Sequence, residues 1–238
     1  MQPAHMYDST ATMFSPDGRI YQVEYAREAV KRGSTAVGVQ YNEGVLLMLD
    51  RRVATAMVEP RSIEKLFKID SHIGCASSGL IADARVLVNK ARNDAQNNRV
   101  QFGEPVWIST LTKELSDLLQ SYTQNGGVRP FGTALLIGGL DPNGQPRLFE
   151  TDPSGAVVAY KATAIGAGRT SAFEVLESEY REGLNLNDAA ALAWKALNRA
   201  VEGSAKADTL DVAVIEKATG YRRLTSDDIK ALIPRDSA

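Results

Sequence analysis

One tract near the start of the chain, residues 14–35, restricts the possible folds more than any other: it reads FSPDGRIYQVEYAREAVKRGST. Its Ser15-Pro16-Asp17-Gly18 segment suits a type I turn, because proline presets φ at the first central position and glycine tolerates the exit geometry. Apolar side chains then recur at helical spacing until the stop signal at Gly33. The tract therefore predicts a helix over residues 19–32 that precedes the first strand instead of lying within a βαβ unit. The apolar positions are Ile20, Val23, Ala26 and Val30.

Downstream of this helix, strand-like hairpins alternate with pairs of amphipathic helices. Strands are expected over residues 34–41, 45–50, 65–70, 72–76, 131–140, 147–151, 156–161, 210–216 and 221–224. Helices are expected over residues 80–99 and 108–122, from a capping box at Ser171 and Glu174 to Gly183, from a cap at Asn187 to Gly203, and in a short segment before Pro234. No alternating βαβ rhythm is present, so the pattern indicates an α+β fold with two antiparallel sheets and helices outside them.

Composition limits the domain organisation and the kinds of partner. The 238 residues contain no linker-like segment, so we expect a polar tail over residues 1–13 and one domain over residues 14–238. A formal net charge of -2 provides neither a basic footprint for nucleic acid nor a polybasic patch for membranes. The single cysteine, Cys75, fits a reducing compartment and a buried thiol. Without a signal peptide or an apolar run of membrane-spanning length, a cytoplasmic location is expected.

The usual cofactor motifs are missing from the sequence. His5 and His72 are far apart and have no cysteine or glutamate at metal-ligand spacing, which argues against zinc. The loop from Ile165 to Thr170 has two glycines of a dinucleotide fingerprint, but Ser171 stands where the third would be. No phosphate-binding GxxxxGK[ST] loop is present, so we expect no cofactor and assign any ATP use to a partner.

The tract over residues 14–35 resembles the N-terminal signature of proteasome α-type subunits, most closely the archaeal ones, and further matching blocks run almost to the C-terminus. The resemblance implies the four-layer helix/sheet/sheet/helix sandwich of N-terminal-nucleophile hydrolases, with an extra N-terminal helix. It also implies a non-catalytic subunit of the 20S core particle. Such a subunit forms outer heptameric rings on proteolytic β subunits, admits unfolded polypeptide, and receives the C-terminal tails of a regulatory AAA ATPase.

The resemblance assigns three sets of residues to this function. The set that matches the gate of the axial channel is Tyr7, Asp8, Pro16 and Tyr25. The set that matches the pocket for ATPase tails is Gly33, Lys65, Gly79 and Leu80. The set that matches the loop narrowing the channel is Asn125, Gly126, Gly127, Val128 and Arg129. Ser9 replaces the usual arginine after Tyr7-Asp8, and Asn125 stands where an aromatic residue is common.

An alternative function places catalysis in this chain. Ser34 occupies the position of the nucleophilic threonine of β subunits, and Asp50 and Lys65 fall where those subunits carry an acid and a lysine. An N-terminal nucleophile uses its own amine as the base, so activity would require removal of every residue before Ser34. That removal would discard the helix over residues 19–32. The sequence therefore favours an inactive subunit, with a self-processed amidohydrolase as the alternative and a stand-alone oligomeric scaffold without a protease partner as a third possibility.

Overall fold

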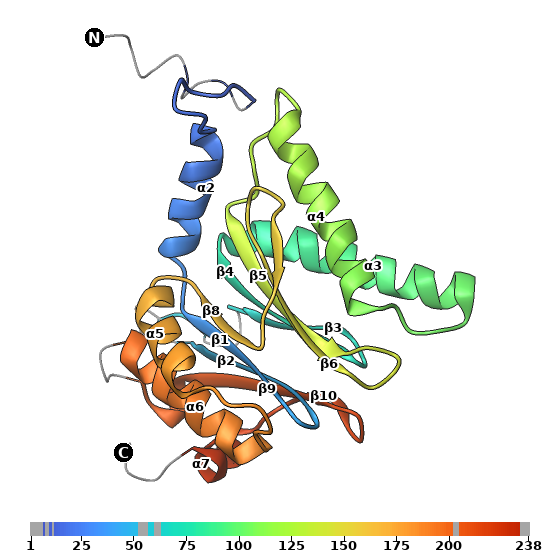
Figure 1. The fold of residues 1–238 in the computed structure, drawn as a ribbon, viewed down its shortest axis with the longest axis vertical. Helices are drawn as coiled ribbons and strands as arrows, with labels where there is room; N and C mark the ends of the chain where they lie inside the picture. Colours follow the sequence, from blue (N-terminus) through green and yellow to red (C-terminus); the bar gives the residue numbers. More distant parts are fainter. Residues whose placement is uncertain are drawn as a thin grey trace.

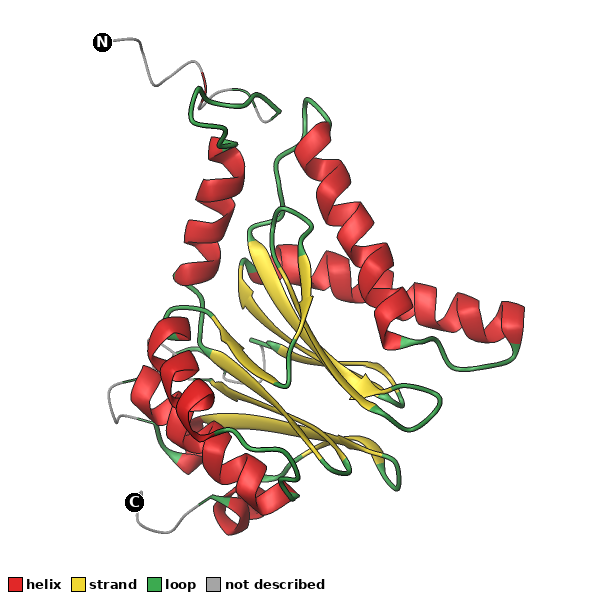
Figure 2. Ribbon diagram, in the orientation of Figure 1, coloured by secondary structure: helices red, strands yellow, loops and turns green. Residues whose placement is uncertain are grey.

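The computed structural model describes Tyr7, Thr10 and residues 12–51, 57–59, 63–201 and 205–233. Within these residues, two five-stranded antiparallel sheets face each other and helices cover both outer surfaces (Figures 1 and 2). This arrangement confirms the predicted four-layer sandwich, including the helix that precedes the first strand.

The first sheet has the strand order β10-β9-β2-β1-β8. Its strands are β1 (Ala36–Tyr41), β2 (Gly44–Asp50), β8 (Ala162–Ile165), β9 (Leu210–Glu216) and β10 (Gly220–Arg223). Its outer surface is covered by α5 (Arg169–Glu179), α6 (Leu186–Ala200) and α7 (Ser226–Leu232).

The second sheet has the order β3-β4-β5-β6-β7. Its strands are β3 (Leu66–Asp70), β4 (Ile73–Gly79), β5 (Thr133–Leu140), β6 (Pro146–Thr151) and β7 (Val157–Ala159). Two helices cover its outer surface, α3 (Ile81–Phe102) and α4 (Ile108–Gln124).

The central strands are buried on both faces, because each sheet lies between a helical layer and the other sheet. In β2, Leu46 and Met48 pack toward α5 and α6, whereas Leu47 and Leu49 pack between the sheets. Side chains alternate between the two faces of a strand, so a strand buried on both faces reads as a continuous apolar run. The continuous apolar sequence from Gly44 to Leu49 in β2 is explained by burial of this strand on both faces.

Two predicted helix starts are wrong. Helix α5 begins at Arg169, two residues before the proposed capping box, and its N-cap, Gly168, makes no side-chain capping bond. The Gly168 N–H instead donates to Thr35 Oγ1 on the segment leading into β1, at 2.9 Å. Helix α6 is capped by Asn185, whose side chain accepts from the N–H of Asp188, not by Asn187. A tertiary contact fixes the first start, and a local asparagine two residues upstream fixes the second.

The strand predicted over residues 156–161 is also shorter than expected, because the chain changes sheets there. Strand β7 ends at Ala159, and β8 begins at Ala162 in the other sheet, antiparallel to β1. The Gln40 N–H donates to the Lys161 carbonyl at 2.8 Å, next to this crossing. The crossing brings the start of α5 beside residues 33–35.

Candidate functional site

Helix α2 (Tyr21–Lys31) precedes the sandwich and packs on the ends of β4 and β5. Val23 is only 4% exposed, and Val30 packs against the core between the sheets. The Arg27 guanidinium donates to both carboxylate oxygens of Asp152, with the shortest contact at 2.9 Å. These contacts fix the helix to the turn between β6 and β7, which the sequence did not indicate.

The residues assigned to the gate lie before and on this helix. Pro16 sits in the expected turn, in which the Gly18 N–H donates to the Ser15 carbonyl at 2.8 Å. Tyr25 is half exposed, and its ring stacks on that of Tyr21 with centroids 6.4 Å apart. Tyr7 is partly buried. The assignment of Asp8 to the gate falls outside the described residues, so it stays a prediction.

The start of α2 and the end of α4 share one end of the molecule. A groove of about 340 Å³ lies between them and is lined from one side by Phe14 and Arg19 and from the other by Gln120 and Gln124. The loop that follows α4 therefore lies near the segment that leads into α2 (Figure 1). The structure places two of the three predicted sets, the α2 part of the gate and the channel loop, at the same end.

Three residues assigned to the ATPase-tail pocket are packed together. A Cβ atom on Gly33 would lie 2.3 Å from the Gly79 nitrogen, and one on Gly79 would lie 2.2 Å from the Gly132 carbonyl oxygen. Gly79 also has φ +106°, a conformation that favours glycine. Leu80 lies over Gly132 and remains 45% exposed. Both glycines are thus required by close packing within the chain itself.

Lys65 lies directly before β3 and reaches the residue that follows Gly33. Its Nζ is 2.5 Å from Ser34 Oγ. Partial burial lowers the pKa of Lys65, while the charge of Asp50 on β2 acts in the opposite direction. The residues of the alternative catalytic function, Ser34, Asp50 and Lys65, therefore occupy one region, which borders the packed cluster of Gly33, Gly79 and Leu80.

The channel loop connects α4 to β5 and is fastened at one end. The Arg129 guanidinium binds both carboxylate oxygens of Asp83, in the first turn of α3, at 2.6 and 2.9 Å. Asp83 also accepts from the Gly132 N–H, and the bonds from Arg129 outweigh burial and hold the pKa of Asp83 below its usual value. The Asn125 side chain donates to the Ser121 carbonyl at 2.7 Å. The sequence did not identify Asp83, although an acid in a first helical turn is a favourable position.

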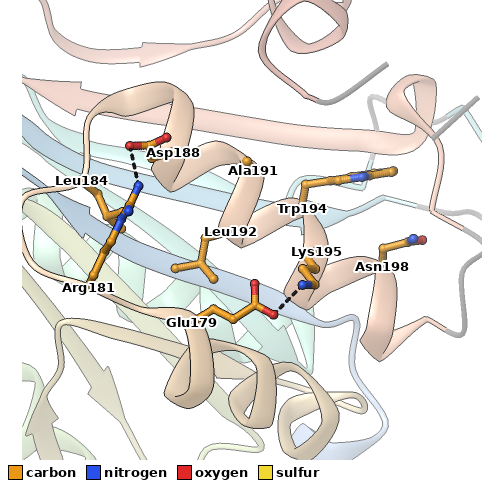
Figure 3. A pocket seen from close by; sticks show the side chains of 9 residues that line it. All are labelled: Glu179, Arg181, Leu184, Asp188, Ala191, Leu192, Trp194, Lys195 and Asn198. Atoms are coloured by element: carbon orange, nitrogen blue, oxygen red, sulfur yellow. Dashed lines mark hydrogen bonds and ion pairs between the residues drawn. The ribbon is translucent and has the colours of Figure 1, made fainter. Parts of the chain in front are cut away.

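A hollow of about 640 Å³ lies over α5 and α6 and contains none of the predicted site residues (Figure 3). Two ion pairs cross it, Glu179 with Lys195 at 2.5 Å and Arg181 with Asp188 at 3.4 Å. Leu192, which lies between the two pairs in Figure 3, is buried in the core that includes the helices. Because each positive side chain is paired with a negative one, these two pairs give the hollow no net positive or negative charge.

Three further features of the described residues concern the cysteine, metal binding and membrane-spanning helices. Cys75 is fully buried, which confirms the prediction of a buried thiol, and burial raises the pKa of this thiol far above its usual value. Among the described residues, no group of three or more histidine, cysteine, aspartate or glutamate side chains is arranged to hold a metal ion. In the same part of the chain, no helix is both long and apolar enough to cross a membrane.

Comparison with known proteins identifies the family over nearly the whole chain. Residues 30–215 match the proteasome subunit family, and residues 7–29 match the N-terminal signature of the alpha-type proteasome subunits. The chain is 55% identical over 233 residues to the proteasome alpha subunit of Methanothermobacter thermautotrophicus, covering 97% of this chain and 94% of that protein.

Two further relatives agree. The chain is 55% identical over 236 residues to the proteasome alpha subunit of Methanopyrus kandleri, covering 99% of this chain and 95% of the relative. It is 54% identical over 231 residues to the proteasome alpha subunit of Methanosarcina barkeri, covering 97% and 92% of the two chains. Together with the two antiparallel sheets and the packed α2, these matches show that the chain belongs to the proteasome subunit family and is of its alpha type.

Proposed function

We propose that this chain is a non-catalytic subunit of a 20S proteasome core particle, in which it forms an outer heptameric ring in the cytoplasm. Its partners in this proposal are copies of itself, β subunits that carry the protease activity, a regulatory AAA ATPase, and unfolded polypeptide in transit. Membership of the alpha-type family supports assembly with other core subunits. Passage of polypeptide would be controlled by the segment before α2.

The packing of α2 ahead of Ser34 carries the non-catalytic part of the proposal. An N-terminal nucleophile needs a free amine on the residue that attacks the substrate. Here the Ser34 nitrogen is not a free amine, because it forms the peptide bond with Gly33, and Gly33 packs against Ser78 and Gly79. The ion pair of Arg27 and Asp152 also holds α2 to the sandwich. Cutting before Ser34 would remove these contacts and uncover the apolar surface beneath α2.

Two observations support a gate and a channel at one end of the ring. The segment leading into α2 and the end of α4 line the same groove, so that segment and the loop over residues 125–129 lie near one another. The ion pair of Arg129 and Asp83 fastens the loop to α3. A loop fastened in this way would keep the width of the channel constant. We assign gating to Tyr7, Asp8, Pro16 and Tyr25, and narrowing of the channel to residues 125–129.

The proposed site for ATPase tails depends mainly on two side chains. Lys65 supplies a partly accessible ammonium group for a terminal carboxylate, and the exposed part of Leu80 supplies apolar contact. Gly33 and Gly79 complete the site by allowing β4 and the end of α2 to approach closely. A tail would then bind through one charge and one apolar contact.

Exposed apolar side chains support subunit contacts at two places. Phe14 and Tyr25 are exposed around α2, and Val100, Phe102 and Trp107 are exposed around the connection between α3 and α4. We assign both places to contacts between subunits, because large apolar side chains are covered when they lie in an interface.

Co-expression with an archaeal β subunit, followed by native mass spectrometry, tests the proposal. We expect a particle in which this chain forms heptameric rings and retains the residues before Ser34. A monodisperse monomer that does not associate with the β subunit would contradict it.

The alternative, a self-processed amidohydrolase, is favoured by one observation: Lys65 Nζ lies 2.5 Å from Ser34 Oγ, within reach of a proton transfer. Intact mass distinguishes the two functions, because processing would leave a chain that begins at Ser34. Ser34→Ala would block that cleavage and provides the control.

A further inference from the structure

The Lys65 side chain is held at both of its ends. At the backbone, the Ser77 N–H on β4 donates to the Lys65 carbonyl at 2.9 Å. At the far end, Lys65 Nζ donates to Ser34 Oγ over 2.5 Å. A lysine ammonium group is carried on a flexible four-carbon stem, so without such a partner it samples many positions. The bond to Ser34 therefore selects one direction for this ammonium group, from the start of β3 toward the segment between α2 and β1.

Ser34 is a firm anchor, because the backbone around it is packed and hydrogen-bonded. The Gly33 N–H donates to the Val30 carbonyl at 2.9 Å, and the Gly33 carbonyl accepts from the Ala167 N–H at 3.0 Å. The loop before α5 also closes over Ser34, since a Cβ atom on Gly166 would lie 2.3 Å from the Ser34 carbonyl oxygen. The hydroxyl that accepts from Lys65 thus projects from a fixed position.

The contact leaves the ammonium group with donors to spare. A charged lysine donates up to three hydrogen bonds and has no lone pair, so the bond to Ser34 leaves two N–H groups for a carboxylate. Burial lowers the pKa of Lys65, while the charge of Asp50 on β2 acts in the opposite direction, and the adjacent Glu64 is exposed. A charged Lys65 cannot take a proton from Ser34. Binding of a carboxylate and activation of Ser34 therefore need opposite charge states of the same lysine.

We propose, on the basis of tail docking at Lys65 as the proposed function, that Ser34 is a positioning residue for the terminal carboxylate of an ATPase tail. Its hydroxyl holds the Lys65 ammonium group in one direction, so that two N–H groups are ordered before the tail arrives. Ordering a long side chain in advance removes part of the entropic cost of binding. The position that matches a nucleophile in β subunits here serves recognition of a carboxylate.

Fluorescence anisotropy of a labelled tail peptide, bound to the full-length protein in its assembled state, tests this role. Ser34→Ala should weaken binding at neutral pH by about three- to ten-fold, the scale of one long side chain that must be ordered on binding. Ser34→Thr keeps the hydroxyl and should restore the affinity. Loss of an acceptor that favours the charged form lowers the pKa of Lys65 further, so Ser34→Ala should also lose binding at a lower pH than the wild type.

Ser78→Ala is the matched control for packing. Ser78 lies beside Gly33, but its hydroxyl donates to the Val30 carbonyl at 3.2 Å. This variant should lose binding at the same pH as the wild type, and an equal shift in Ser78→Ala and Ser34→Ala would overturn the proposal.

The affinities of the two sites' variants separate this role from docking itself. Wild-type affinity in Ser34→Ala, together with weak binding by Lys65→Ala, would overturn the positioning role and leave docking at Lys65 intact. Ser34→Thr that binds no better than Ser34→Ala would also overturn it. Wild-type affinity in Lys65→Ala would instead contradict the proposed docking site.

Discussion

Lys65 is the residue for which the two candidate functions make opposite claims. If it binds the carboxylate of an ATPase tail, Lys65→Ala should weaken binding of a tail peptide by about ten-fold or more, since a charge-assisted hydrogen bond contributes roughly 1.5 to 3 kcal/mol. Fluorescence anisotropy of a labelled tail peptide measures this. Lys68→Ala, an exposed lysine on β3, is the matched control, and a peptide with an amidated C-terminus should bind to the wild type as weakly as the free peptide binds to Lys65→Ala.

The pH dependence of tail binding has a definite sign. Because burial lowers the pKa of Lys65, the charged form is lost at a lower pH than for an exposed lysine, and binding should weaken as pH rises through that lowered value. Equal affinity for the free and amidated peptides would contradict the assignment of Lys65.

A second prediction for a single residue concerns Asp83 and the channel loop that it holds. Asp83→Asn should increase hydrogen exchange of residues 125–132 by about ten-fold. A hydrogen bond to a charged acceptor contributes roughly 1.5 to 3 kcal/mol to stability, and the solvent exposure of Arg129 weakens the contribution of this ion pair to the free energy of opening the loop. The pKa of Asp83 is lowered, so its contribution is present at neutral pH and is lost as pH falls through the lowered value. Asp94→Asn is the control, since Asp94 is also ion-paired on α3, with Lys90 of the same helix. An equal effect of both substitutions would show that Arg129 does not fasten the loop.

At the residue scale, the structure gives physical reasons for residues that the sequence alone could not explain. The resemblance assigns Gly33 and Gly79 to a pocket, and the structure explains both by backbone packing against Ser78 and Gly132. The partners Arg27 and Asp152 lie 125 residues apart, so no local pattern links them. Local patterns report spacing along the chain, whereas these contacts depend on how the two sheets and α2 come together.

Helix α2 is the element on which the proposed function depends most. Arg27→Ala should increase its local opening by about five-fold, corresponding to roughly 1 kcal/mol for a partly exposed ion pair. Lys31→Ala is the matched control, because Lys31 pairs with Glu28 in the same helix. Hydrogen exchange of residues 21–31 measures both variants. Equal exchange in the two would mean that Asp152 does not anchor the helix.

The apolar stripe of α2 makes a stronger prediction for assembly. Replacing Val23 and Val30 with aspartate places charges in buried contacts, at a cost of several kcal/mol out of the roughly 5 to 15 that stabilise a domain. Rings should then be lost from native mass spectra. Circular dichroism must confirm that the domain remains folded, and intact rings would show that α2 is not needed for assembly.

Elements with strong patterns were predicted well. The turn at Pro16, helix α2, the hairpin of β1 and β2, and strand β9 lie within about two residues of their expected bounds. Two of the errors occur where tertiary contacts determine the boundary: Thr35 Oγ1 accepts from the Gly168 N–H at the start of α5, and the chain crosses between sheets after Ala159. Residue periodicity carries no information about either event.

For the whole molecule, the gate makes a prediction about rate. Particles that lack residues 2–12 should hydrolyse a short fluorogenic peptide faster than full-length particles with equal β-subunit content, because the tail would obstruct the axial channel. The increase should be modest, since Ser9 replaces an arginine that could have ordered the tail through several hydrogen bonds. Equal rates would show that the tail is not a barrier.

The most direct test of the central claim, that catalysis lies outside this chain, is peptide hydrolysis by particles that combine it with a β subunit whose nucleophilic threonine is replaced by alanine. We expect no hydrolysis above background in these particles, and an undiminished rate when wild-type β subunits are combined with Ser34→Ala in this chain. Hydrolysis that disappears in Ser34→Ala but persists with the inactive β subunit would contradict the claim.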